Sequence, residues 1–144
     1  LLIEDAQQFI QEKRLGPDAL DPDFDFDAFR RTFGKGRAMI KSALMNQQRV
    51  AGIGNIYADE ILFQAGIHPK KKLTQLGEED YRKIFQAMKE VLQVAIERRA
   101  NPEEFPDDYL IPHRQVGERC PNCPGTIEKV KISGRTAYFC PRCQ

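Results

Sequence analysis

The chain has 144 residues, 41% of them hydrophobic, and a formal net charge of +1. This length suits one domain, or one domain with a small appendage, and allows a hydrophobic core to be buried. Because no apolar run approaches the ~20 residues of a membrane span and the first residues lack signal-peptide organisation, we expect no membrane association. The first residue is Leu1 rather than Met, which favours a fragment of a longer protein.

Charge is distributed unevenly along the chain. Residues 28–77 carry nine basic and two acidic residues, and residues 111–144 carry six basic and two acidic residues. The other two blocks, residues 1–27 and 78–110, have a net negative charge. Positive charge is therefore concentrated in the two blocks that carry the motifs described below, a glycine turn and a cysteine cluster.

The N-terminal part is expected to be helical. Apolar residues recur on one face of residues 1–14, which predicts a short amphipathic helix or a connector from a preceding domain. A linker follows, in which a glycine and two prolines break regular structure. Asp25 or Asp27 then caps a helix in which Phe29 and Phe33, one turn apart, face the core.

The stretch from Gln47 to Glu60 is typical of one helix ending, a turn with two glycines, and a second helix beginning. Gly52 and Gly54 allow a positive φ or the close approach of another backbone. Asn55 is predicted as the N-cap of the second helix, which ends at Gly66. Since N–H groups at a helix N-terminus bind anions, the turn is a candidate phosphate site; the alternative is a simple turn between helices.

Charged residues surround this turn. Asp59 and Glu60 are expected in or near the first turns of the second helix, where the helix dipole favours acids. Lys41 is placed on the first helix, Arg49 at its end, and Lys70–Lys72 in a loop beyond the second helix. These bases are candidates for holding phosphates, with solvated surface charge as the alternative.

The longest helix is predicted between Glu78 and Arg99. Gly77 serves as its N-cap, acids fill its first turn, and basic residues close its C-terminal end. Apolar residues at i, i+3, i+4 and i+7 form a stripe that we assign to the core: Tyr81, Ile84, Phe85, Met88, Val91, Leu92, Ala95 and Ile96.

Four cysteines form a C-x2-C-x16-C-x2-C pattern: Cys120, Cys123, Cys140 and Cys143. Two residues between cysteines let both thiolates reach one tetrahedral ion, with Zn–S bonds of ~2.3 Å. Their clustering favours a metal site in a reducing compartment over disulfides. The segment between the pairs is predicted to form a hairpin that turns at Ser133-Gly134, so the unit is a zinc ribbon. Four thiolates leave no open position, and we expect one structural zinc ion, with iron as the alternative metal.

Arg135 follows the hairpin turn and is expected to project away from the metal. An exposed arginine is usually only solvated, but a rigid hairpin tip is also a way to present arginine to a nucleic-acid groove. The residue patterns therefore predict a mostly helical chain with a small C-terminal β-hairpin zinc ribbon.

Taken together, these motifs resemble the formamidopyrimidine-DNA glycosylase/endonuclease VIII family. The resemblance is carried by four stretches: Leu44–Gln47, Gly52–Ala58, Ala65–Pro69 and Gly134–Thr136 within the cysteine ribbon. It implies a helix-two-turn-helix DNA-binding domain over residues 15–112 and a four-cysteine zinc finger over residues 113–144.

The resemblance also implies roles for individual residues. Asn55 corresponds to the turn asparagine that holds the phosphates flanking a lesion, and Gly52 and Gly54 belong to the same DNA-binding turn. Arg135 matches the finger arginine that helps to grip and kink DNA opposite the flipped base. Lys41 aligns with a lysine that approaches the DNA backbone.

Two departures from the family pattern bear on activity. The family's catalytic groups are an N-terminal proline and the glutamate after it, both in a separate β-rich domain, and this chain contains neither. We therefore expect no catalytic residue here and an inactive fragment of a base-excision repair DNA glycosylase/AP lyase. The short, proline-rich segment from 101 to 119 favours the endonuclease VIII branch, which prefers oxidised pyrimidines, over the branch specific for oxidised purines.

The implied partners are double-stranded DNA with a damaged base or an abasic site, and the missing N-terminal catalytic domain. We expect a monomer that is cytoplasmic and nucleoid-associated. Two alternatives stay open. One is a non-enzymatic, zinc-dependent nucleic-acid-binding module, and the other is a structural ribbon that mediates protein contacts.

Overall fold

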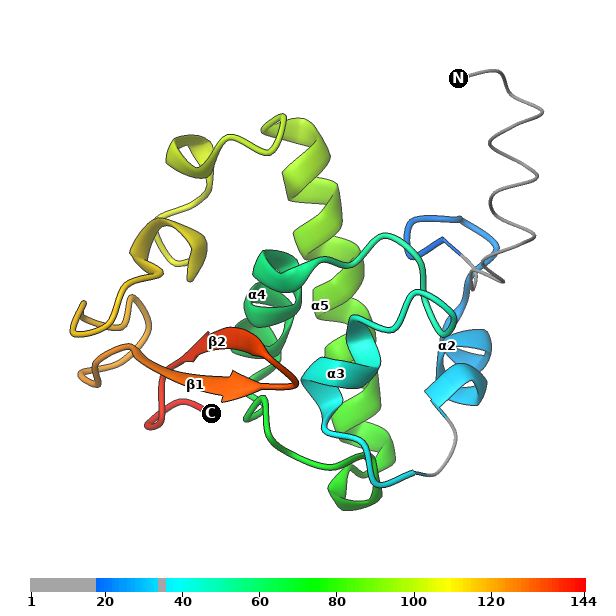
Figure 1. The fold of residues 1–144 in the computed structure, drawn as a ribbon. Helices are drawn as coiled ribbons and strands as arrows, with labels where there is room; N and C mark the ends of the chain where they lie inside the picture. The colour runs from blue at the N-terminus through cyan, green and yellow to red at the C-terminus, as the bar shows by residue number, and fades with distance from the viewer. Residues whose placement is uncertain (1–17, 34–35) are drawn as a thin grey trace.

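The computed structural model describes residues 18–33 and 36–144, so the helix expected over residues 1–14 lies outside the described part. The main elements are α2 (Phe26–Phe33), α3 (Ile40–Leu44), α4 (Asn55–Ala65), α5 (Glu78–Glu97), β1 (Glu128–Ile132) and β2 (Arg135–Phe139). Three short 3-10 turns join them: η1 (Leu73–Gln75), η2 (Pro102–Glu104) and η3 (Ile111–His113). The prediction of a mostly helical chain with a C-terminal hairpin is confirmed (Figure 1). Within the described ranges, no helix is both long and apolar enough to cross a membrane.

Helix α5 is the longest element, and α2 and α4 pack against it (Figure 1). As predicted, Gly77 precedes it, and the Asp80 carboxylate accepts a 3.0 Å hydrogen bond from the Gly77 N–H. The predicted apolar stripe is buried or partly buried except at Ile96, which is 59% exposed. Ile96 lies in the last turn of α5 next to the buried Ala95 but is itself exposed, so its assignment to the core is wrong.

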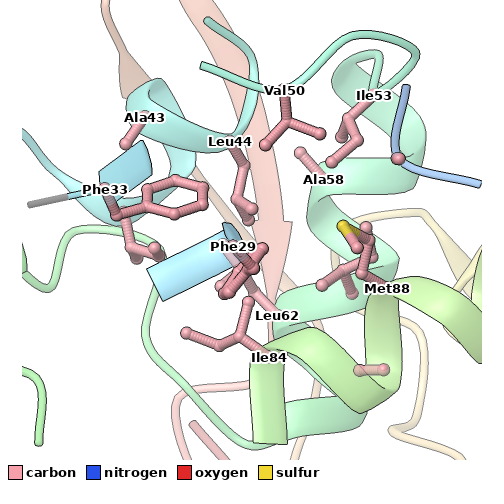
Figure 2. Packing of buried hydrophobic residues seen from close by; sticks show 14 of the residues in the cluster. Phe29, Phe33, Ala43, Leu44, Val50, Ile53, Ala58, Leu62, Ile84 and Met88 are labelled. Atoms are coloured by element: carbon pink, nitrogen blue, oxygen red, sulfur yellow. The ribbon is translucent and has the colours of Figure 1, made fainter. Parts of the chain in front are cut away.

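The main core lies where α2, α3, α4 and α5 meet. Phe29 is fully buried, and its ring centroid lies 4.6 Å from that of Phe33 and 5.3 Å from that of Phe85. Figure 2 shows Phe29, Phe33 and Ile84 among the side chains of this cluster. Asp25 caps α2 as predicted, because its carboxylate accepts a 2.9 Å hydrogen bond from the Ala28 N–H.

The first helix of the glycine-turn motif is shorter than predicted. Helix α3 ends at Leu44, and side-chain hydrogen bonds organise the residues that follow into turns. The Gln47 carboxamide accepts a bond from the Gly52 N–H at 2.9 Å and donates one to the Ile53 carbonyl at 3.0 Å. Arg49 therefore lies in the turn, and its guanidinium donates to the Thr32 and Phe33 carbonyls at 3.1 and 3.0 Å, which closes the C-terminal end of α2.

Helix α4 begins one residue earlier than predicted. Its N-cap is Gly54, and Asn55 is its first helical residue, so the assignment of Asn55 as N-cap is wrong. The helix ends as predicted at Gly66, whose φ of 72° is the left-handed conformation that glycine adopts freely. Asp59 and Glu60 lie beyond the first turn and are buried, so the expectation that they complement the helix dipole is also wrong.

The C-terminal hairpin pairs β1 with β2 in antiparallel register, with Ile132 opposite Arg135. Ser133 and Gly134 have φ values of 52° and 79°. Positive φ at both central residues is typical of a type I′ turn, which matches the twist of a two-residue hairpin. The hairpin turn predicted at these residues is confirmed.

Candidate nucleic-acid interface

The zinc finger brings four thiol groups together. Their sulfur atoms all lie within 4.8 Å of one another, from Cys120, Cys123, Cys140 and Cys143. The Cys120–Cys143 and Cys123–Cys140 sulfur pairs are 3.6 and 3.4 Å apart. A tetrahedral zinc ion with bonds of ~2.3 Å places its ligand atoms about 3.8 Å apart, so the four sulfurs need only a small adjustment to hold the ion.

The surrounding backbone also suits a thiolate-bound metal. The Asn122 N–H lies 3.5 Å from the Cys120 sulfur, and the Gly125 N–H lies 3.4 Å from the Cys123 sulfur. A Cβ atom at Gly125 would lie only 3.0 Å from the Cys140 sulfur, so the knuckle leaves no space for a side chain there. The site fits one structural zinc ion with four cysteine ligands and no position for substrate.

The finger packs against the helices along the free edge of β2. Thr136 and Tyr138 belong to the pairs whose backbone groups point away from β1. The Thr136 carbonyl accepts hydrogen bonds from Lys41 Nζ at 3.0 Å and from Asn55 Nδ2 at 3.2 Å. The Tyr138 N–H donates to Asp59 Oδ2 at 3.1 Å. Side chains of α3 and α4 therefore satisfy an edge that would otherwise be open.

We call this interface between β2 and the side chains of α3 and α4 the joint. The Asp59 carboxylate lies at its centre and is 1% exposed. Lys41 Nζ lies 2.7 Å from Asp59 Oδ1, and Arg114 Nη2 lies 2.8 Å from Asp59 Oδ2. The Arg114 guanidinium also stacks on the Tyr138 ring at 4.4 Å. Burial lowers the pKa of Lys41, and the ion pair with Asp59 opposes this shift.

Two further contacts fix the two ends of the finger. At the hairpin tip, the hydroxyl oxygens of Ser42 and Ser133 are 2.8 Å apart, so the tip lies against α3 (Figure 1). At the C-terminus, Gln144 Nε2 donates to the Ile67 carbonyl at 2.9 Å. The finger therefore contacts the helical part at its hairpin tip, along β2 and at its C-terminal residue.

The residues expected to bind DNA occupy different positions in this joint. Arg135 is exposed and directly precedes Thr136, whose carbonyl Asn55 binds, so Asn55 and Arg135 lie on neighbouring parts of one surface. Lys41 lies beneath them, only 1% exposed, and the charge of Arg135 is among the groups that lower its pKa.

The two turn glycines differ in their structural need. Gly52 has a φ of 101°, which a residue with a side chain rarely adopts. Gly54 has an ordinary φ of −94°, and a Cβ added there would have no atom of the described residues within 4 Å. Within the described chain, neither the backbone nor the packing therefore requires glycine at position 54.

Glu60, next to Asp59, is 0% exposed and holds a different segment. Its carboxylate accepts hydrogen bonds from the Leu110 N–H at 2.9 Å and the Ile111 N–H at 2.7 Å, both in the connection between α5 and the finger. Burial raises its pKa, and these hydrogen bonds oppose the shift. Sequence reasoning missed Arg114 and the buried role of both acids, because no local pattern links positions more than 50 residues apart.

Comparisons with known proteins agree with this arrangement. A family model described as the formamidopyrimidine-DNA glycosylase H2TH domain matches residues 15–106, and one described as a zinc finger found in FPG and IleRS matches residues 117–144. Formamidopyrimidine-DNA glycosylase of Listeria innocua is 36% identical over 143 residues, which cover 92% of this chain and 52% of that protein. The Thermomicrobium roseum protein of the same name is 37% identical over 142 residues, covering 91% and 49%.

Solved structures show the same similarity. A complex between the Lactococcus lactis Fpg and DNA containing an abasic site has a TM-score of 0.84 at 34% identity, covering 100% of this chain and 56% of that one. A structure of MutM in complex with DNA containing carbocyclic 8-oxo-G has a TM-score of 0.83 at 35% identity, with the same coverage. The chain therefore spans about half the length of the relatives it matches.

Proposed function

We propose, from the premise that this chain belongs to the formamidopyrimidine-DNA glycosylase family, that it is the DNA-binding part of a base-excision repair DNA glycosylase/AP lyase. Its ligand is duplex DNA with an oxidised base or an abasic site. The chemistry is assigned to an N-terminal catalytic domain outside this chain, so the chain alone binds DNA without cleaving it. In this proposal the protein acts as a monomer on chromosomal DNA in the cytoplasm.

One observation carries the proposal: Asn55 of the glycine turn donates a hydrogen bond to the backbone carbonyl of Thr136, the residue directly after Arg135 of the finger. Asn55 Nδ2 has a second N–H to offer, and Arg135 is exposed. A guanidinium and an amide on one surface are the donors that proteins use to hold neighbouring phosphates. Arg135 and Asn55 therefore bind the DNA backbone from the same side.

The glycine turn gives a second line of support. No side chain of the described residues caps α4, and its first turn contains N–H groups that have no partner within the helix. Gly54 directly precedes these N–H groups, and a Cβ atom at this position would have no atom of the described residues within 4 Å. A phosphate that approaches the N-terminus of α4 accounts for a glycine that the chain's own packing does not require.

The lesion class is the finer part of the proposal. The relatives are named formamidopyrimidine-DNA glycosylases, and two solved relatives hold DNA with an abasic site or an 8-oxo-G analogue. We therefore place formamidopyrimidine and oxidised-purine lesions first in a test panel. Oxidised pyrimidines, which the short segment before the finger favours, come second.

Fluorescence anisotropy with the zinc-loaded chain tests the proposal. The probes are a duplex with a tetrahydrofuran abasic-site analogue and the same duplex undamaged. We expect tighter binding to the abasic duplex, and a loss of about tenfold on Arg135→Ala or Asn55→Ala, each equivalent to about 1.4 kcal/mol. Lys83→Ala, which removes one exposed charge from α5, is the control and should bind like the wild type. No binding at low salt overturns the proposal, and equal binding to both duplexes favours the non-enzymatic module.

A further inference from the structure

A buried ionic cluster joins the finger to the helices. It consists of Lys41 on α3, Asp59 on α4 and Arg114 on the connection to the finger, with side-chain exposures of 1%, 0% and 18%. We infer that Asp59 and Lys41 are positioning residues that fix the finger in one register against α4 and so hold Arg135 beside Asn55. This inference rests on the proposed function.

The contacts of Asp59 connect three separate segments. Asp59 Oδ1 forms an ion pair with Lys41. Asp59 Oδ2 forms an ion pair with Arg114 and accepts a hydrogen bond from the Tyr138 N–H of β2. A neutral side chain of the same shape would keep one hydrogen bond but would leave two buried or partly buried cations without their counter-charge. Removing one member of a buried ionic group costs more than the group contributes as a whole, so each member depends on the others.

The Lys41 side chain is buried in the same joint. Its ammonium contacts Asp59 Oδ1 at 2.7 Å and the Thr136 carbonyl at 3.0 Å, and the residue is 1% exposed. An ammonium in this position acts on DNA through the placement of Arg135 and not by contact with a phosphate. This assignment replaces the direct backbone contact that the family resemblance implies for Lys41.

The geometry of an edge strand explains why the position of Arg135 must be fixed by side chains outside the strand. Only every second residue of β2 points its backbone groups outward, and the described contacts use two of them, at Thr136 and Tyr138. A slip of two residues along this edge would keep the hydrogen-bond pattern but move Arg135 by about 6.8 Å. Asp59 and Lys41 oppose the slip through the cluster that they form with Arg114, because the Arg114 guanidinium held by Asp59 stacks on the Tyr138 ring at 4.4 Å, a side-chain contact that exists in one register only.

A double-mutant cycle on DNA affinity tests the inference. Asp59→Asn is measured alone and in the Arg135→Ala background, by anisotropy with the abasic duplex. We expect Asp59→Asn to weaken binding about tenfold alone and less than about twofold when Arg135 is already absent, because the two act as a unit. Glu60→Gln is the matched control: it neutralises the adjacent, equally buried acid, which holds the connection and not the finger, and its effect on binding should be small. Additive losses for Asp59 and Arg135 overturn the inference.

A second readout does not depend on DNA. Hydrogen exchange of the Tyr138 amide reports the docked edge, whereas the Ala137 amide, which faces β1, reports the hairpin itself. Asp59→Asn should speed exchange at Tyr138 and leave Ala137 protected, and Lys41→Met should do the same. If Asp59→Asn fails to retain one zinc ion per chain, Arg114→Gln takes its place. Unchanged protection of Tyr138 contradicts the inference, whereas wild-type protein that does not bind DNA contradicts only the proposed function.

Discussion

Asn55 Nδ2 donates a 3.2 Å hydrogen bond to the carbonyl oxygen of Thr136, a residue 81 positions away in the sequence. This bond joins the glycine turn to the finger at the residue directly after Arg135. Two motifs that the sequence presents as independent are therefore parts of one surface. The stability of the joint and the affinity for DNA should depend on the same few residues.

The first prediction concerns stability at this bond. Asn55 is not the N-cap of α4, so Asn55→Ala should leave the helix start intact and remove the bond to Thr136. A lost hydrogen bond of this kind costs about 1 kcal/mol of unfolding free energy. Urea denaturation of the zinc-loaded chain, followed by tyrosine fluorescence, measures the change. A loss above about 3 kcal/mol would show that Asn55 supports more than this one contact.

The second prediction compares two isoleucines on one helix. Ile84 is 0% exposed and Ile96 is 59% exposed, although both belong to the apolar stripe of α5. Ile84→Ala should cost about 2–5 kcal/mol because it leaves a cavity in the core, and Ile96→Ala should cost less than about 0.5 kcal/mol. The same urea experiment on both variants measures this difference. Equal costs would mean that Ile96 is covered by a surface absent from the described residues.

The third prediction is the effect of zinc removal. The aromatic core around Phe29 does not include the finger, whose buried residues Cys120, Ile127 and Cys140 form a separate, smaller cluster with Phe63 of α4 and Leu110. Chelation should therefore unfold the hairpin and release the β2 edge while most of the helical circular dichroism is retained. Loss of helix and hairpin signals at the same chelator concentration would show that the two clusters form one cooperative unit.

The fourth prediction follows from the buried Glu60 carboxylate, whose pKa is raised above its ordinary value of 4.5 mainly by burial. The folded chain then binds this proton more tightly than the unfolded chain, so the stabilisation is present below pH 4.5 and is lost as the pH rises through the folded-state pKa. Hydrogen bonds from Gln64 and from the Leu110 and Ile111 N–H groups lower the pKa of Glu60, and the charge of Asp108 raises it. The unfolding free energy of the wild type minus that of Glu60→Gln should fall as the pH rises above 4.5. A difference that stays constant or rises with pH would contradict the burial argument.

Local sequence signals predicted the elements well where a single residue determines the backbone. Asp25, Gly77 and Gly66 mark helix ends because their caps depend on neighbours within a few residues. The Ser133-Gly134 pair is a local signal of the same kind, because glycine favours the positive φ that a two-residue hairpin turn needs and that the structure shows. The cysteine spacing likewise indicates the metal site, because two residues between thiols determine the geometry of a knuckle.

Long-range contacts account for what the sequence did not reveal. Asp59 satisfies the usual criteria for an acid near a helix start, but its partners Arg114 and Tyr138 are 55 and 79 positions away. Asn55 similarly resembles an N-cap, whereas its carboxamide binds the finger. The division into residues 15–112 and 113–144 stays a prediction, and the contacts across it are those of the joint described above.

The salt dependence of DNA binding tests the central claim most directly. The claim is that Arg135, held beside Asn55 by the docked finger, contacts the phosphate backbone of damaged DNA. The slope of log affinity against log salt concentration is measured for the wild type and for Arg135→Ala on the abasic duplex. The account predicts that the variant binds more weakly and that the magnitude of its slope is smaller by about 0.9, the value for one lost phosphate contact. Two parallel lines, with equal slopes for both proteins, would contradict it.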